Sequence, residues 1–173
     1  MTLELRPYNE ADESAAVAIH QEMLADDFYF LLFWDPTMTW AAFLASVDEL
    51  RRGVIPSTSP PYRVRSDQLA AVVNGEIVGR VSVRFELNEY LSERGGHVGY
   101  GVAPAHRARG YATEILRQAL GVLRAEGVKR VLVTCDDNNL ASARVIEKNG
   151  GVLESVSPPQ DGDNKFVRRY WIE

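Results

Sequence analysis

One short segment combines the residue types that bind phosphate. It reads Arg107-Ala108-Arg109-Gly110-Tyr111-Ala112 and stands between a strand-like run and a predicted helix. The first turn of a helix exposes backbone N–H groups that have no helical partner, at the positive end of the helix dipole. A glycine there lets a phosphate come close to the backbone, and arginine side chains add charge-assisted hydrogen bonds. The segment therefore predicts an anion site that suits a phosphate-bearing ligand.

A second block of polar residues follows one predicted strand later. It begins with Asn139-Leu140-Ala141-Ser142 and ends with Glu147-Lys148-Asn149-Gly150. Arg107-x-x-Gly110-x-Ala112 resembles the Arg/Gln-x-x-Gly-x-Gly/Ala signature of the GCN5-related N-acetyltransferases (GNAT), and the second block resembles the later motif of that family. The two blocks occur in the family order. Together with two early helices, the resemblance covers nearly the whole chain.

This resemblance implies a function and a set of ligand contacts. It implies an acetyl-coenzyme A (acetyl-CoA) dependent N-acetyltransferase that moves an acetyl group to a primary amine by direct attack in a ternary complex, without a metal. In the family, the first motif holds the pyrophosphate of acetyl-CoA and the later motif lies close to its pantetheine. The contacts that the resemblance implies for acetyl-CoA are Val102, Arg107, Ala108, Arg109, Gly110, Tyr111, Ala112, Asn139 and Ser142.

One departure from the family pattern concerns proton transfer. Many members carry a Tyr in the later motif that can protonate the leaving thiolate, and Ile146 stands at that position here. A thiol has a pKa of about 8.5, so its thiolate is fairly stable and a dedicated acid is optional. The departure leaves two hypotheses, an active acetyltransferase or a catalytically silent domain that binds or senses acyl-CoA. Turnover with any amine would separate them.

Three residues are candidates for the general base that takes a proton from the attacking amine. An alkyl amine has an unperturbed pKa of about 10.4, so it needs such help at neutral pH. His97 lies near the start of the strand that leads into the arginine-rich loop, and a pKa of about 6.5 suits the task. The alternative for His97 is a histidine that hydrogen-bonds a loop. Glu86 and Glu89 follow a strand expected to neighbour the reaction centre, and the alternative for both is a solvated turn.

Other side chains have simpler explanations. Tyr100 is expected to pack in the core, on the strand face opposite to His97. Cys135 ends a buried strand and is expected to act as a small hydrophobe, not as a nucleophile. Residues 28–34 are rich in aromatics and are expected to be mostly core, although Asp26-Asp27 beside them would suit a cationic amine.

The elements that position these residues follow from apolar periodicity and turn residues. Asn74-Gly75 between two strand-like runs predicts a tight hairpin, because both residues tolerate positive φ. The strand–helix–strand unit from His97 to Cys135 is expected to be a right-handed crossover with parallel strands. The fold class is α/β (α+β), with a mixed, mostly antiparallel central sheet and flanking helices. Strands are predicted at residues 2–6, 68–73, 76–87, 97–103, 130–135, 152–157 and 166–172, and helices up to about residue 25 and at 37–52, 111–126 and 140–149.

Length and composition set the remaining expectations. The 173 residues fit a single domain, residues 1–173. The net charge of 19 − 24 = −5 argues against a nucleic-acid partner. The family resemblance implies a small-molecule or peptide amine as the acceptor. One cysteine and three histidines without metal-ligand spacing argue against a disulfide framework and a metal site. With no recognisable signal peptide or membrane-length apolar run, we expect a cytoplasmic protein that does not bind membranes. Members of the resembled family are often dimers, so the resemblance leaves a homodimer open.

Overall fold

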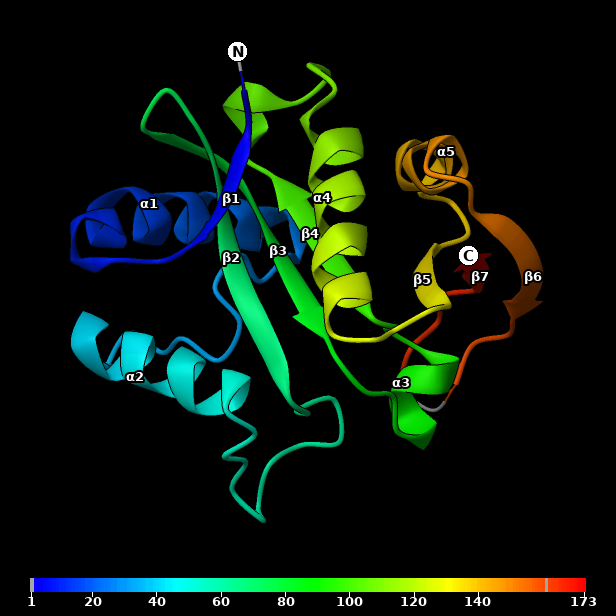
Figure 1. Cartoon of the computed structure of the whole chain (residues 1–173), viewed down its shortest axis with the longest axis horizontal. Coiled ribbons are helices and arrows are strands. Elements are labelled where there is room, and N and C mark those ends of the chain that lie inside the picture. Colours follow the sequence, from blue (N-terminus) through cyan, green and yellow to red (C-terminus); the bar gives the residue numbers. More distant parts are fainter. Residues whose placement is uncertain (1, 161) are drawn as a thin grey trace.

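The computed structural model describes residues 2–160 and 162–173 of the chain. Its strands are β1 Glu4–Pro7, β2 Ser66–Val73, β3 Glu76–Arg84, β4 Val98–Val102, β5 Val131–Asp136, β6 Val152–Ser157 and β7 Val167–Ile172. Within the described residues they form one seven-stranded sheet in the order β1-β2-β3-β4-β5-β7-β6 (Figure 1). All neighbouring strands are antiparallel except β4 and β5, which are parallel. The predicted fold class is confirmed.

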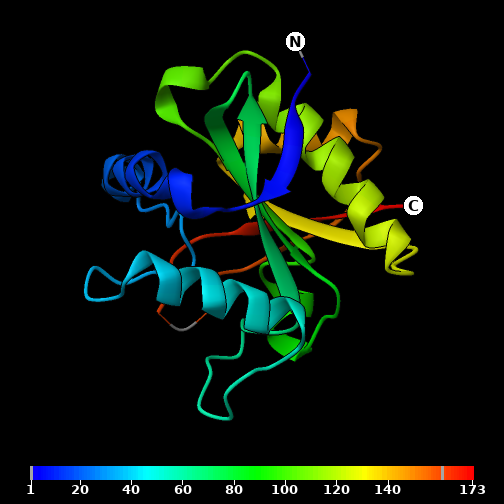
Figure 2. The same ribbon diagram turned by 60° about the vertical axis from the view of Figure 1, so that its left-hand side comes forward.

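Helices cover both faces of this sheet, as Figures 1 and 2 show. They are α1 Glu13–Met23, α2 Trp40–Arg51, α3 Glu89–Glu93, α4 Tyr111–Ala125 and α5 Leu140–Lys148, with short 3-10 turns at Glu10–Asp12, Leu24–Asp26 and Pro104–His106. One apolar core joins α4 and α5 to Val81, Val98 and Val133 of the sheet. A second core joins α1 and α2 to Ala70 and Val72 on the opposite face. The sheet is therefore a rigid layer that positions side chains from both sides.

The helix after the arginine-rich loop has the strongest amphipathic pattern. The predicted stripe of α4 is buried at Ile115, Leu116, Ala119 and Leu123. Gly127 follows the helix end with a φ of 87°, in the left-handed conformation that terminates helices. Burial of this stripe fixes the N-terminus of α4 beside the end of β4.

The two parallel strands touch over a short stretch only. Their register pairs Val98 with Val133, next to an isolated bridge between Gly96 and Val133. Beyond Val98, toward the carboxyl ends, no further β4–β5 pair occurs among the described residues, while β4 stays paired with β3 and β5 with β7. The sheet therefore opens between the carboxyl ends of β4 and β5. Ligands of open α/β sheets bind at such points.

Turn chemistry was predicted well, and one short helix was not predicted. Asn74 and Gly75 have φ values of 52° and 81°, as the predicted hairpin between β2 and β3 requires. The helix α3 lies where the sequence predicts a turn. It begins after Asn88, whose side chain accepts a hydrogen bond from the Leu91 N–H, and it is too short for periodicity to reveal. Among the described residues, no helix is both long and apolar enough to cross a membrane.

Candidate functional site

The loop between β4 and α4 has the backbone shape of an anion site. Ala108 and Gly110 have φ values of 60° and 83°, both in the left-handed region. Left-handed residues beside a helix start turn successive N–H groups toward one point. The first helical hydrogen bond runs from the Glu114 N–H to the Gly110 carbonyl, so the N–H groups of residues 111–113 have no helical acceptor. A Cβ on Gly110 would meet no atom within 4 Å, so the space in front of the helix is open.

An outer cavity of about 420 Å³ begins beside this loop. The residues with predicted acetyl-CoA contacts that line it are Val102, Arg107, Ala112, Asn139 and Ser142. The others, which lie in the adjoining loop and helix start, are Ala108, Arg109, Gly110 and Tyr111. The structure thus brings together two sequence blocks that a whole helix and a strand separate. The Arg107 guanidinium reaches across the cavity to Asp26, with an Nη2–Oδ2 distance of 2.8 Å.

A second cavity of about 260 Å³, the inner cavity, lies at the opening between β4 and β5. It adjoins the outer cavity through shared lining residues, which are Phe28, Tyr100, Asn139 and Ser142. Its other lining residues are Arg84, Gly95, Val98, Gly99, Thr134, Cys135 and Asp136. A long ligand with its phosphates at the N-terminus of α4 can extend through the outer cavity into the inner one. This path suits acetyl-CoA, with the phosphates at one end and the thioester at the other.

Phe28 stands at the junction of the two cavities. A Cβ on Gly101 would lie only 2.4 Å from Cζ of the Phe28 ring, so the ring rests directly on the β4 backbone. The Arg80 guanidinium lies over the same ring, with its carbon 4.7 Å from the ring centroid. In the aromatic segment 28–34, Phe30 is fully buried as predicted, whereas Phe28 forms part of the cleft wall.

Tyr100 is a site residue that sequence reasoning assigned to the core alone. Its ring does pack against the core on the α4 side of the sheet, but the residue also lines both cavities. The hydroxyl lies 2.7 Å from Oγ of Ser142. Burial raises the pKa of Tyr100 to about 12, so the phenol stays protonated at neutral pH. Ile146, which replaces the family tyrosine, is fully buried, and Tyr100 supplies a phenolic O–H in the cleft.

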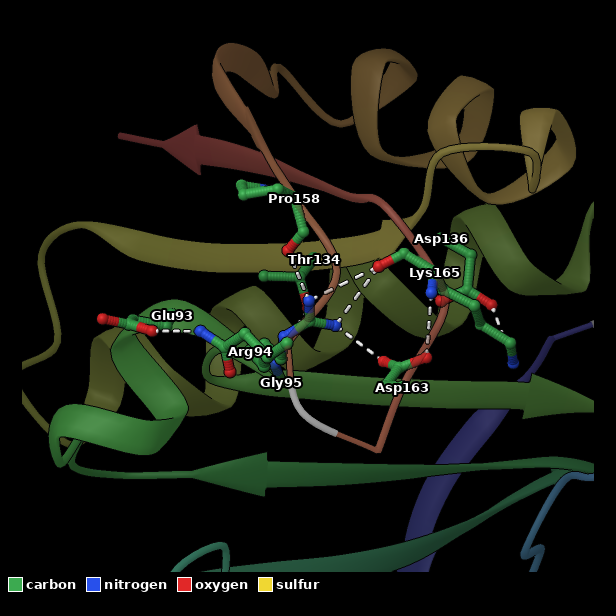
Figure 3. Close-up of polar contacts among 9 residues, drawn as sticks. Glu93, Arg94, Gly95, Thr134, Asp136, Pro158, Asp163 and Lys165 are labelled. Atoms are coloured by element: carbon green, nitrogen blue, oxygen red, sulfur yellow. Dashed lines mark hydrogen bonds and ion pairs between the residues drawn. The ribbon is translucent and has the colours of Figure 1, made fainter.

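A carboxylate stands on the β5 side of the inner cavity. Asp136, at the end of β5, forms an ion pair with Lys165, whose Nζ lies 3.3 Å from Oδ2 of Asp136 (Figure 3). The Lys165 side chain is 53% exposed, so this ion pair is weak and exchangeable. The contact shows that an alkylammonium group fits against Asp136.

Arg94 forms hydrogen bonds with two residues that lie between β6 and β7, near Asp136. Arg94, directly after α3, donates from Nη1 to Oδ2 of Asp163 and from Nη2 to the Pro158 carbonyl, both at 2.7 Å (Figure 3). The Arg94 side chain is buried, whereas its partner Asp163 is 42% exposed. The next residue, Gly95, donates its N–H to Oγ1 of Thr134 at 3.1 Å. Gly95 and Thr134 both line the inner cavity, so this last contact joins two parts of its wall.

His97 does not line either cavity of the cleft. Its imidazole is buried, and Nδ1 accepts a hydrogen bond from the Leu132 N–H at 2.9 Å. The His97 N–H in turn donates to the Leu132 carbonyl at 2.8 Å. Burial lowers the pKa of His97 to about 4, so the ring is neutral at physiological pH. This geometry fits the alternative of a histidine that hydrogen-bonds the backbone. A role of His97 as general base stays a prediction.

The buried imidazole predicts a pH-dependent loss of stability. His97 in the unfolded chain takes up a proton near pH 6.5, but in the folded protein only near pH 4. The free energy of unfolding should therefore fall as pH decreases from about 6.5 toward 4, by on the order of 3 kcal/mol. We expect urea titrations at pH 7.5 and 4.5 to differ less for His97→Asn, whose amide cannot titrate. An equal pH dependence in both proteins would contradict this role.

Glu86 and Glu89 lie outside the cleft. Both are exposed, and neither lines the outer or the inner cavity. Oε1 of Glu86 accepts from the Arg65 N–H at 3.4 Å, and Glu89 lies in the first turn of α3 beside a separate hollow of about 460 Å³. The alternative of a solvated turn fits both positions. A catalytic role for either glutamate stays a prediction, and the structure does not bring the two together with His97.

Cys135 lines the inner cavity but has the properties of a protonated thiol. Burial raises the pKa of its thiol to about 11, so almost none is thiolate at neutral pH. Across residues 2–160 and 162–173, no three His, Cys, Asp or Glu side chains gather as a metal site.

Comparison with known proteins identifies the family of this chain. Residues 2–152 match the family model described as an acetyltransferase (GNAT) domain. No curated protein sequence gives a significant match to this chain. Among solved structures, RimJ of Mycobacterium smegmatis in complex with CoA-disulfide is similar over 98% of this chain and 81% of its own, with a TM-score of 0.72 and 18% identity.

Two Salmonella typhimurium structures are also similar. The protein yncA with acetyl-CoA matches over 100% of this chain and 94% of its own, with a TM-score of 0.68 and 16% identity. The acetyltransferase that modifies the N-terminal serine of ribosomal protein L7/L12 matches over 99% of this chain and 95% of its own, with a TM-score of 0.68 and 20% identity. At these identities the likeness establishes a shared fold.

Proposed function

This chain belongs to the GNAT acetyltransferase family, and we propose that it transfers the acetyl group of acetyl-CoA to a primary amine on a small molecule or a peptide. The continuous path from the Gly110 loop through the outer cavity into the inner cavity carries the proposal. It suits a ligand with phosphates at one end and a thioester at the other. The thioester end of this path lies beside Tyr100 and Asp136.

The proposed reaction is a direct transfer in a complex of both substrates. The ammonium of the acceptor loses a proton, and the neutral nitrogen attacks the thioester carbonyl carbon. A C–N bond forms, the C–S bond breaks, and the sulfur leaves with the electron pair and takes up a proton. The products are the N-acetyl amine, the free thiol of CoA and one proton released to solvent.

We assign the movement of these protons to two side chains that line the inner cavity. Asp136 would hold the acceptor ammonium in the position that Lys165 now occupies and pass its proton to water. The Tyr100 hydroxyl would donate a hydrogen bond to the leaving sulfur, in place of the tyrosine that the family carries at the position of Ile146. Neither role was predicted from the sequence.

The state of the nearby thiol supports direct attack by the amine. Cys135 is the one cysteine of the chain, and its raised pKa keeps it as a thiol. A thiol is a far weaker nucleophile than a thiolate, so an acetyl-cysteine intermediate has little support.

We expect Asp136→Asn to lower kcat by about 100-fold at pH 7, the effect of a lost proton-transfer group. The deficit should shrink as pH rises toward the amine pKa of about 10.4, because more of the amine is then already neutral. Tyr100→Phe should cost only about tenfold, since a thiolate is a good leaving group. Steady-state assays of CoA release from pH 6 to pH 10 would measure both.

The matched control for this experiment is Asp137→Asn. Asp137 is the next residue, lines neither cavity and pairs with Nε of Arg168 at 2.7 Å. It should keep the wild-type kcat and pH profile. A wild-type rate for Asp136→Asn at pH 7 would remove Asp136 from the mechanism.

A further inference from the structure

Two arginines of β3, Arg80 and Arg84, lie near the inner cavity, and Arg84 lines it. Arg84 lines the cavity and donates from Nη1 to the carbonyls of Gly95 and Gly96, at 3.2 and 3.1 Å. Its Nε and Nη2 have no hydrogen-bond partner within the described part of the chain. These two nitrogens form the edge of a guanidinium that binds a carboxylate with two parallel hydrogen bonds.

Arg80 adds a second positive charge behind Arg84. It lies on the same face of β3, is only 4% exposed and donates to the carbonyls of Gly99 and Tyr29, at 3.0 and 2.9 Å. Its Nε is buried and has no partner within residues 2–160 and 162–173.

Neither arginine has a counter-ion among residues 2–160 and 162–173. In the described residues, all ion pairs of the chain involve other side chains. Burial lowers the pKa of Arg80 and of Arg84 to about 10, and both remain cations at neutral pH. Arg80 is buried and Arg84 is half-buried, so their charges are partly removed from water, and an anionic ligand would lower the cost of that desolvation. The pair is therefore a site for an anion.

Gly99 leaves this anion site open to the cavity. It lines the inner cavity, and a Cβ on it would lie 3.7 Å from Nη1 of Arg80 and 3.8 Å from Nη2 of Arg84. Because glycine has no side chain, nothing at this position of β4 stands between the guanidinium groups and the cavity.

The two sides of the inner cavity therefore carry opposite charges. Arg84 stands on the β3 side, and Asp136, which already accepts an alkylammonium, stands on the β5 side. A ligand that places a carboxylate near one wall and an ammonium near the other would satisfy both. An amine without an anionic group would leave the arginine pair uncompensated.

We infer that the acceptor is an amine with a carboxylate beside it, as in a free α-amino acid. Arg84, backed by Arg80, binds the carboxylate, and Asp136 receives the amino group next to the thioester. This inference rests on the proposed function, which places the acceptor in the inner cavity. A protein N-terminus has the same α-amine but an amide in place of the carboxylate, so it lacks the group that the arginines bind.

The test compares free α-amino acids with their α-amides as acceptors. The twenty common amino acids and the matching amides would be assayed with saturating acetyl-CoA. The best amino acid should have a kcat/KM roughly 100-fold above that of its amide, as expected for a carboxylate held by a buried charge. Arg84→Gln should remove most of this acid-to-amide ratio, and Arg84→Lys should restore part of it. A purely structural role of Arg84 would lower both rates and leave the ratio unchanged.

Control variants and assays distinguish a failure of this inference from a failure of the proposed acetyltransferase function. Arg52→Gln, at the exposed end of α2, should keep the ratio. A thermal shift with acetyl-CoA in each variant shows that the protein is folded and that its donor site is intact. Equal rates for acids and amides, or acetylation of peptides in preference to amino acids, would overturn the inference and leave the acetyltransferase function standing. If no acid, amide or other amine were acetylated, the proposed function itself would fail.

Discussion

Replacing Gly110 with glutamate is expected to weaken acetyl-CoA binding severely while the protein stays folded. The φ of 83° and the open space in front of Gly110 mark it as the point of closest approach for a phosphate. A carboxylate there would face the pyrophosphate at short range, which costs about 3 kcal/mol after allowance for solvent screening. We therefore expect Kd to rise by on the order of 100-fold or more. Isothermal titration calorimetry with acetyl-CoA would measure the change.

The other end of the same helix provides a matched control. Gly127 has a φ of 87°, is exposed, and a Cβ on it would also meet no atom within 4 Å. Gly127→Glu therefore introduces the same charge and a similar backbone strain far from the loop. It should bind acetyl-CoA as the wild type does. Wild-type affinity in a folded Gly110→Glu variant would show that this loop does not hold the phosphates.

Replacing Gly96 with alanine should cause the largest loss of stability among single methyl additions. Gly96 has a φ of 61°, and a Cβ on it would lie 2.5 Å from the carbonyl oxygen of Leu132. That oxygen belongs to β5 and accepts from the His97 N–H at 2.8 Å, so it cannot move aside without separating β4 from β5. Left-handed strain and backbone overlap together should cost about 3 kcal/mol or more. For a domain of this size, Tm should fall by roughly 6–12 °C.

Gly127→Ala isolates the strain from the overlap. It has the same left-handed conformation as Gly96 but open space around it, so it should cost only about 1 kcal/mol and lower Tm by roughly 2–4 °C. Differential scanning calorimetry of both variants measures the difference. Equal losses would mean that the junction of β4 and β5 is not as tightly closed as the structure shows.

The loop between β4 and α4 could be predicted from the sequence because its backbone shape rests on local conformation. A glycine at a helix start and two nearby arginines suffice to define an anion site, whatever the rest of the fold does. The strands and long helices were also predictable, because periodicity and turn residues such as Asn74-Gly75 act over a few positions. The long-range pairing that opens the sheet between β4 and β5 has no such local signal.

The lining of the inner cavity could not be predicted from the sequence. Arg84 and Asp136 lie far apart in the sequence and face one cavity only because β3, β4 and β5 meet in a particular register. Arg80 and Arg84 are four residues apart on β3 and therefore lie on one strand face, but alternation alone does not show that this face is buried. Two charged residues on one face of a central strand were the available signal. The orientation of His97 toward the Leu132 N–H likewise depends on tertiary contact.

The most direct test of the account follows the acetyl group itself. Purified protein would be incubated with acetyl-CoA and a panel of primary amines that includes the free α-amino acids. Mass spectrometry would detect the acetylated amine while a thiol assay counts the CoA released. We predict one released thiol for each acetylated amine. Tight binding of acetyl-CoA with no acetylated amine, and with thiol release no faster than spontaneous hydrolysis, would contradict the account and support a silent acyl-CoA binding domain.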